Sequence, residues 1–203
     1  MKLAKKAKKY LDKYTAKEAT KRLFIAVDLP DSAKNYLYKI TSNLNKKDRD
    51  IRAITEGNIH LTLKFLGETQ ISKIEKIAEA VKMTAASFDK FNYAISSSFG
   101  VFPRVDSARI LFVPVLDGED KIKKVFLKLE NNLNRINIKR EDREFICHIT
   151  VARIRNKKNI ADAIGNIKID YGKKLDCSKL TMFESILNPS GAEYIILDEF
   201  ELK

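Results

Sequence analysis

The sequence is poor in cysteine and in long apolar runs. Cys147 and Cys177 are its only cysteines, too few for a disulfide framework. Its longest apolar runs have the length of a β-strand, whereas a membrane-spanning helix needs about 20 apolar residues. The basic N-terminus also lacks the apolar core and the cleavage site of a secretory signal. These absences predict a cytoplasmic protein that does not insert into a membrane.

The composition predicts a globular protein with an anionic partner. The chain has 203 residues, 44% of them hydrophobic and 33% charged, which suits one soluble domain or two small lobes. Its net charge of +12 is uneven, because residues 1–22 hold nine Lys or Arg against two acidic residues. The remaining 181 residues therefore carry only +5, so charge alone does not identify a nucleic-acid-binding protein.

Residues 1–21 are predicted to form a basic helical extension in front of a domain at residues 22–203. Leu3, Ala7, Leu11 and Tyr14 recur at helical spacing among lysines. Such a helix could extend an RNA-binding surface, pack on the domain or fray at the chain end.

The only two histidines, His60 and His148, share a pattern. Each is followed two positions later by a threonine, Thr62 or Thr150, inside an apolar and β-prone run. Residues i and i+2 of a strand point to the same face, so each run presents an imidazole beside a hydroxyl. With nine threonines in the chain, chance would produce both pairs in about one such sequence in five hundred. The alternative is two core histidines whose hydrogen bonds are satisfied by neighbouring hydroxyls.

Strand-like and helix-like patterns alternate around these two runs, at 58–66 and 145–154. Further strands are predicted at 22–28, 51–54, 91–98, 108–116, 179–187 and 193–202, and helices at 31–45, 71–86, 119–134 and 157–164. A loop is predicted at 100–104, and Pro114 suggests an edge strand or a bulge. Several strands are adjacent in sequence, which favours an α+β fold with largely antiparallel sheets. We expect two lobes with one histidine strand on each side of a central cleft.

Two facing imidazoles suit acid–base chemistry. A reference pKa of about 6.5 lets one histidine be neutral and another charged near neutrality. The threonine hydroxyls suit hydrogen bonding to a phosphate oxyanion. The sequence has no carboxylate cluster, Gly-rich phosphate loop or metal-ligand set. Two Cys and two His could in principle bind zinc, but they lack the close spacing of such sites. The residues therefore predict phosphoester chemistry without a metal.

The sequence resembles the 2H phosphoesterases, and among them the RNA 2′,3′-cyclic phosphodiesterases, also known as 2′-5′ RNA ligases. The resemblance runs from about Arg22 to the C-terminus. It is carried by RLFIAVDLP, NIHLTLKFLG, the Phe-Pro-Arg segment at 102–104, FICHITVARIR and FESILNPSGAEYIIL. Together these segments are specific to the family, whereas one His-x-Thr motif alone would be weak evidence.

The resemblance implies a two-lobed fold of paired antiparallel sheets with helices outside. It implies a monomeric hydrolase that opens the 2′,3′-cyclic phosphate of an RNA end, or of a cyclic nucleotide, to a 2′-phosphate without metal or cofactor. The two histidines would be the acid–base pair and the two threonines would bind phosphate. Arg153 matches a substrate-binding arginine of the family, and Phe65 matches an aromatic residue that stacks on the base.

The positions of Phe65 and Arg153 conflict with a regular strand. Each lies five residues after its histidine, so each should point away from the histidine face. A bulge or a strong twist would be needed to turn them inward. Otherwise Phe65 would belong to the core and Arg153 to a surface ion pair. Cys147, where the family often has proline, has the opposite parity to His148 and should leave the histidine face unchanged.

Two other functions remain possible from the sequence. The chain could be an enzyme of the same family that acts on another bond, such as a 2′-5′ linkage or a small cyclic nucleotide. It could also be an RNA-binding module without turnover. The presence of both histidines and both threonines disfavours the module, because Lys or Arg would serve binding as well.

Overall fold

The computed structural model describes residues 19–189 and 191–203. Residues 1–18, most of the predicted basic extension, lie outside the described residues. The first described strand, β1 (Thr20–Asp28), is flanked on both sides within one antiparallel sheet.

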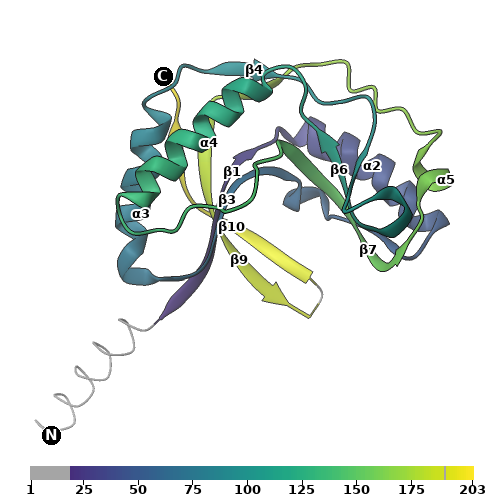
Figure 1. Cartoon of the computed structure of the whole chain (residues 1–203), viewed down its shortest axis with the longest axis horizontal. Coiled ribbons are helices and arrows are strands. Elements are labelled where there is room, and N and C mark those ends of the chain that lie inside the picture. The colour runs from purple at the N-terminus through teal and green to yellow at the C-terminus, as the bar shows by residue number, and fades with distance from the viewer. Residues whose placement is uncertain (1–18, 190) are drawn as a thin grey trace, which may run out of the picture.

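Two four-stranded antiparallel sheets form the centre of the protein (Figure 1). The first has the order β10–β9–β1–β3, with β3 (His60–Gln70), β9 (Lys179–Asn188) and β10 (Gly191–Glu201). The second has the order β2–β7–β6–β5, formed by β2 (Ile51–Ala53), β5 (Gly100–Phe102), β6 (Ala108–Pro114) and β7 (His148–Lys158). A small third sheet pairs β4 (Phe91–Tyr93) with β8 (Leu175–Cys177). The predicted α+β fold is confirmed.

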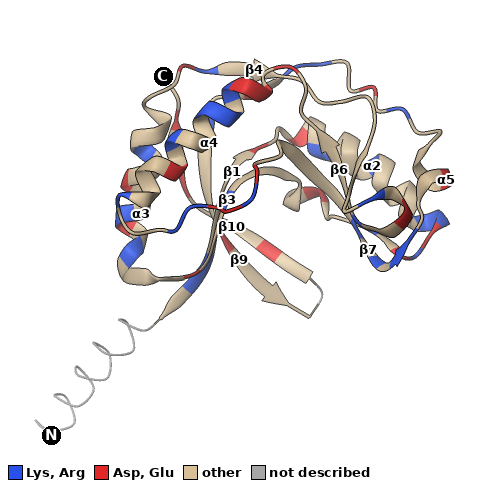
Figure 2. Cartoon of the chain, in the orientation of Figure 1, with Lys and Arg blue, Asp and Glu red and all other residues tan. Residues whose placement is uncertain are grey.

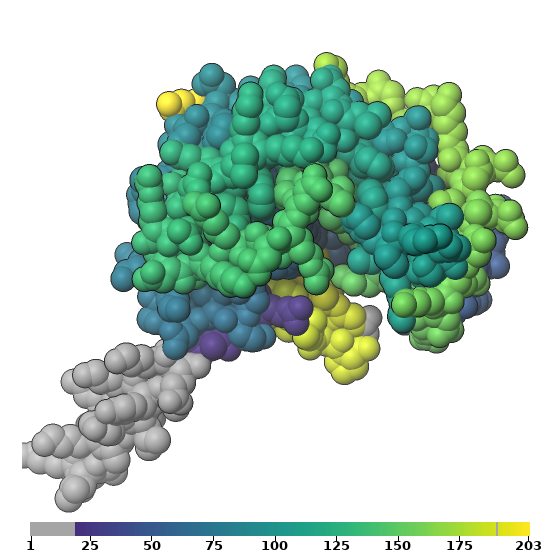
Figure 3. Space-filling model, in the orientation of Figure 1, coloured from purple at the N-terminus to yellow at the C-terminus, as the bar shows by residue number. Residues whose placement is uncertain are grey.

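Helices cover the outer sides of the sheets. α3 (Ile71–Ala85) and α4 (Glu119–Asn134) pack against each other beside the first sheet, while α2 (Asp31–Lys47) packs on β2 and β7 of the second (Figure 1). A fourth helix, α5 (Ala161–Ile164), is a single short turn. α2 follows β1 of the first sheet but packs on the second sheet. α4 follows β6 of the second sheet but packs beside the first sheet. The β9–β10 hairpin projects from the body of the protein (Figure 3).

Some predicted boundaries were wrong. The predicted loop at 100–104 contains β5, which pairs with β6, so β6 is not an edge strand. Pro114 is instead the last residue of β6, where its missing N–H removes no hydrogen bond from the middle of the strand. β7 begins at His148, three residues later than predicted, and includes Lys157 and Lys158, which were assigned to a helix. β8 was not predicted, since its three residues are too few for a periodic pattern.

β3 contains a bulge directly after the His60–Thr62 pair. Along β1, Phe24 pairs with Phe65 and Ala26 pairs with Thr62, so three steps on β3 match two steps on β1. Phe24 and Ala26 point to the same face, and paired residues share a face. The inserted residue, Leu63, therefore brings Phe65 to the face of Thr62.

β7 contains the same bulge at the equivalent position. Along β6, Ile110 pairs with Arg153 and Phe112 pairs with Thr150, which leaves Val151 as the inserted residue. By the same alternation, Arg153 lies on the face of Thr150. The bulge that the parity of these positions requires is thus present in both histidine strands.

A buried ion pair connects β3 to the segment that leads into β7. Lys64 and Glu130 have side chains that are only 5% and 6% exposed, and Lys64 Nζ lies 2.7 Å from Glu130 Oε1. Lys64 Nζ also donates a hydrogen bond to the carbonyl of Lys139 at 2.9 Å, and Glu130 Oε2 accepts one from the amide of Glu141 at 2.7 Å. In Figure 2 this charged segment runs from α4 towards the start of β7. The pair thereby anchors the approach to His148.

We expect Glu130→Gln to lower the free energy of unfolding by about 3 kcal/mol, because it leaves the Lys64 charge buried without a counterion. Urea denaturation at pH 7 measures the change. Glu119→Gln is the matched control, since it breaks the exposed Glu119–Lys123 pair and should cost about 0.5 kcal/mol or less. Equal losses in the two variants would contradict the structural role of the buried pair.

Candidate active site

The imidazole of His60 is fixed by hydrogen bonds on both nitrogens. Nδ1 lies 2.8 Å from the carbonyl oxygen of Asn58, and Nε2 lies 2.9 Å from Thr62 Oγ1. A carbonyl can only accept, so Nδ1 donates its proton and the neutral ring accepts the Thr62 hydroxyl at Nε2. The ring stacks on Phe24 at a centroid distance of 4.8 Å and meets the edge of Tyr194 at 5.3 Å.

His148 has the corresponding arrangement. Its Nδ1 donates to the carbonyl oxygen of Ile146 at 2.6 Å, again the residue two positions earlier. Its ring meets Phe102 and Phe112 edge-on, at centroid distances of 5.3 Å and 5.1 Å. Both histidines therefore have the same neutral tautomer, in which Nε2 is the nitrogen available for proton transfer.

Burial lowers the pKa of both imidazoles and so favours their neutral form. It lowers the pKa of His60 to about 4 against the opposing hydrogen bond to Asn58, and the charges of Lys34 and His148 lower that pKa to a smaller extent. Burial also lowers the pKa of His148, against the opposing hydrogen bond to Ile146. β3 and β7 lie next to each other although they belong to different sheets. The two histidines are therefore neutral near pH 7 and close enough for their charges to interact.

Phe65 and Arg153 line one hollow between the two sheets. The hollow has a volume of about 180 Å³, and Phe24 and Tyr194, which contact His60, also line it. Phe65 is 64% exposed, so its alternative assignment to the core is wrong. Arg153 forms no ion pair with any carboxylate of residues 19–189 and 191–203, so the alternative of a surface ion pair finds no partner within these residues.

The aromatic residues around the histidines were not identified from the sequence. Phe24 reaches His60 through the pairing of β1 with β3, and Tyr194 reaches it from the β9–β10 hairpin. Phe102 and Phe112 reach His148 from β5 and β6. A faint signal existed, because both Phe102 and Tyr194 lie in segments that carry the family resemblance. Their convergence on two rings depends on strand pairing, which the pattern did not specify.

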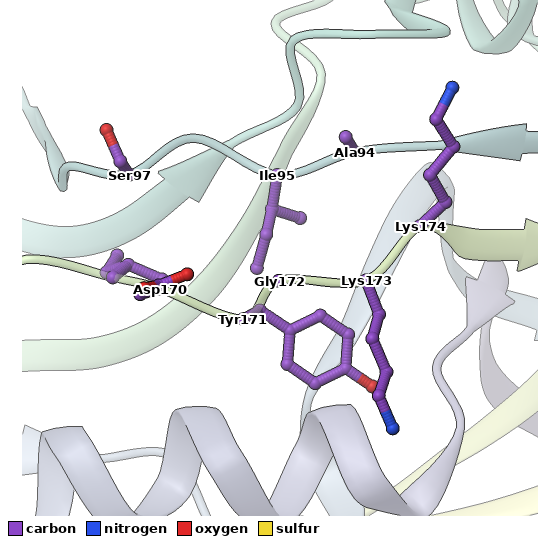
Figure 4. A pocket seen from close by; sticks show the side chains of 9 residues that line it. Ala94, Ile95, Ser97, Asp170, Tyr171, Gly172, Lys173 and Lys174 are labelled. Carbon is purple, nitrogen blue, oxygen red and sulfur yellow. The ribbon is translucent and has the colours of Figure 1, made fainter.

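A second hollow lies away from the histidines (Figure 4). It has a volume of about 350 Å³ and lies between residues 94–97 and residues 169–174. Tyr171 Oη is hydrogen-bonded to Ser32 Oγ at 2.9 Å, and Lys174 pairs with Asp117 at 2.7 Å. Several polar groups of this hollow thus already have partners, and none of its lining residues belongs to β3 or β7.

Cys147 and Cys177 are buried and carry free thiols. Cys147 faces the core, while His148 points to the opposite side and contacts Phe102 and Phe112, as their parity predicts. Within the described ranges, no group of three or more His, Cys, Asp or Glu side chains is arranged to hold a metal ion. None of the described helices has both the length and the apolar character to cross a membrane.

Solved structures with this fold define its class. TT0787 of Thermus thermophilus superposes with a TM-score of 0.76 at 22% identity, over 89% of this chain and 97% of that one. Escherichia coli LigT complexed with 3′-AMP superposes with a TM-score of 0.73 at 20% identity, over 91% of this chain and 99% of that one. The fold is that of the LigT-like 2H phosphoesterases.

Sequence comparison gives the family. The family described as LigT like Phosphoesterase matches residues 27–112, which include the first histidine motif. The RNA 2′,3′-cyclic phosphodiesterase of Thermotoga maritima is 30% identical over 188 residues, 90% of this chain and 96% of that protein. The one from Methanothermobacter thermautotrophicus is 28% identical over 187 residues, 89% of this chain and 98% of that protein. The chain belongs to the RNA 2′,3′-cyclic phosphodiesterase family, and it is an enzyme.

We expect the low pKa of His60 to make the protein less stable in acid. The unfolded chain binds a proton at His60 below about pH 6.5, whereas the folded protein does so only near pH 4, so stability falls as the pH drops through this window. At pH 5 the loss from this group should be about 2 kcal/mol.

His60→Asn tests this expectation, because it removes the titrating group and keeps a polar side chain. The difference in unfolding free energy between pH 7 and pH 5, measured by urea denaturation, should be about 2 kcal/mol smaller than in the wild type. His148→Asn should change the pH dependence in the same direction. A pH dependence unaltered by His60→Asn would show that His60 titrates normally in the folded protein.

Proposed function

We propose that this enzyme hydrolyses the terminal 2′,3′-cyclic phosphate of RNA to a 2′-phosphate, with His60 and His148 as the acid–base pair. The observation that carries the proposal is the matched presentation of the two imidazoles. Each donates Nδ1–H to the carbonyl two residues earlier, so in each ring Nε2 is the unprotonated nitrogen that can accept a proton. The names of the two relatives described above support the choice of substrate.

The reaction needs two proton transfers. One histidine takes a proton from water as the water oxygen bonds to phosphorus. The bond from phosphorus to O3′ breaks, and the other histidine gives its proton to O3′, so the product is a 2′-phosphate with a free 3′-hydroxyl. Neither transfer requires a metal, and a single chain supplies both imidazoles. We therefore propose a metal-independent, monomeric enzyme, located in the cytoplasm.

Burial has a consequence for the acid. Both histidines are neutral near pH 7 in the free protein, yet one must be protonated for the reaction. The cyclic phosphate carries a negative charge, which favours the charged form of a nearby imidazole. The acid thus acquires its proton together with the substrate, and protonation is coupled to substrate binding.

The neighbouring side chains suit the rest of the substrate. Thr62 and Thr150 lie on the same strand faces as the histidines, and the Thr150 hydroxyl can donate a hydrogen bond to a phosphate oxygen. The Thr62 hydroxyl can do so once His60 Nε2 carries a proton, because Nε2 then donates to Thr62 instead of accepting from it. Arg153 can pair with phosphate, and the exposed ring of Phe65 can stack on the terminal base.

His60→Ala and His148→Ala should each lower kcat at least about a hundred-fold on an oligonucleotide with a 2′,3′-cyclic phosphate, because each removes a proton-transfer group. Far-ultraviolet circular dichroism checks that the fold is kept. Product analysis separates a 2′-phosphate from a cleaved 2′-5′ linkage and from binding without turnover. Wild-type activity that is lost in EDTA and restored by a divalent metal would refute the metal-independent mechanism.

Thr62→Val and Thr150→Val keep the side-chain shape and remove the hydroxyl. Each should weaken transition-state binding by about 1–3 kcal/mol, which appears as a lower kcat/KM. Thr69→Val is the control, because Thr69 lies at the far end of β3 and donates to the carbonyl of Gly67. If kcat/KM of the two test variants stayed at the wild-type value, phosphate recognition would have to come from other groups.

A further inference from the structure

Arg52 and Arg153 face each other across the ladder between β2 and β7. They are direct partners in the antiparallel register, so their side chains lie on the same face of the sheet. Like charges in this position destabilise a sheet unless something separates or neutralises them. Like Arg153, Arg52 forms no ion pair with any carboxylate in the part of the chain that the structure describes. The pair is therefore an unneutralised cationic site.

The two arginines line a hollow that is larger than the one beside Phe65. Its volume is about 520 Å³, within the range of about 300–1,000 Å³ that is usual for ligand pockets. Its wall includes Arg52, Thr55, Asn58, Arg153, Asn188 and Tyr194. Glu193 also lines it, with its Oε2 accepting a hydrogen bond from the Asn188 amide at 3.1 Å. The hollow thus has room for one nucleotide and offers it donors, acceptors and an aromatic ring.

The larger hollow is continuous with the candidate active site. Arg153, Ala192 and Tyr194 line both hollows, so the two hollows are adjacent. Asn58, in the wall of the larger hollow, holds the His60 ring through its carbonyl oxygen. The two hollows therefore share a wall that includes Arg153, and each is lined by residues that contact His60.

We propose that the larger hollow binds the penultimate nucleotide of the RNA, and that Arg52 and Arg153 together hold the phosphodiester that links it to the terminal nucleotide. The guanidinium group is planar and binds phosphate through paired hydrogen bonds, so two opposed arginines suit one phosphodiester. This inference rests on the proposed function and makes it more specific. The preferred substrate is an RNA chain of two or more nucleotides, and a cyclic mononucleotide leaves the larger hollow empty.

The test compares two product-like ligands by titration calorimetry, adenosine 2′-phosphate and the dinucleotide ApA with a terminal 2′-phosphate. We expect the wild type to bind the dinucleotide at least about ten-fold more tightly. Arg52→Gln should reduce this ratio to about three-fold or less, and Arg52→Lys, which keeps the charge, should recover part of it. The salt slope of dinucleotide affinity should flatten by about 0.7 in Arg52→Gln, as for one lost contact to single-stranded RNA. Arg49→Gln is the control, because it removes the same charge from an exposed position that lines neither hollow.

An Arg52→Gln variant with the wild-type ratio would overturn the assignment of the larger hollow. Equal affinities of the wild type for the two ligands would overturn it as well. Turnover of the corresponding cyclic phosphates is measured alongside, and its absence in the wild type would refute the proposed function. Even without turnover, the ratio of dinucleotide to mononucleotide affinity tests the role of the larger hollow. Failure of the proposed function can therefore be distinguished from failure of this inference.

Discussion

The inserted residue that follows the His-x-Thr pair in each histidine strand is the constraint on which the candidate site depends. Leu63 in β3 and Val151 in β7 interrupt the regular alternation of side chains. Without them, Phe65 and Arg153 would lie on the opposite strand face from the histidines. A bulge interrupts the regular hydrogen bonding between the strands at one point. It also places the histidine, the threonine and either Phe65 or Arg153 on one face of the strand.

The bulge also explains the buried lysine. Two successive residues, Leu63 and Lys64, are directed into the protein in β3, as are Val151 and Ala152 in β7. In β7 the second of these is a small apolar residue that packs in the core. In β3 it is Lys64, which can be buried only because Glu130 provides a counterion. The same two side chains form hydrogen bonds to the backbone of Lys139 and Glu141. The buried ion pair therefore also positions the segment that leads into the second histidine strand.

Charge is distributed in two zones around the cleft. Inside, the histidines lie among aromatic rings, and burial keeps them neutral near pH 7. In the larger hollow, Arg52 and Arg153 present their guanidinium groups from paired positions. This separation suits a phosphate ester: permanent cations attract and hold the anion, while titratable groups move protons. Arginine could not perform the proton transfer, and a neutral imidazole could not attract the anion as strongly.

The sequence by itself determined the local features of this protein. Strand periodicity placed each histidine beside its threonine, and helical periodicity identified α2, α3 and α4, because both patterns depend on neighbours a few residues apart. Parity even indicated that a bulge was needed for Phe65 and Arg153 to reach the cleft. Only the tertiary structure decided which residues meet across long separations. The aromatic contacts of Phe24 and Tyr194 with His60, the Lys64–Glu130 pair and the opposition of Arg52 to Arg153 all follow from strand register and helix crossing, which no local pattern specifies.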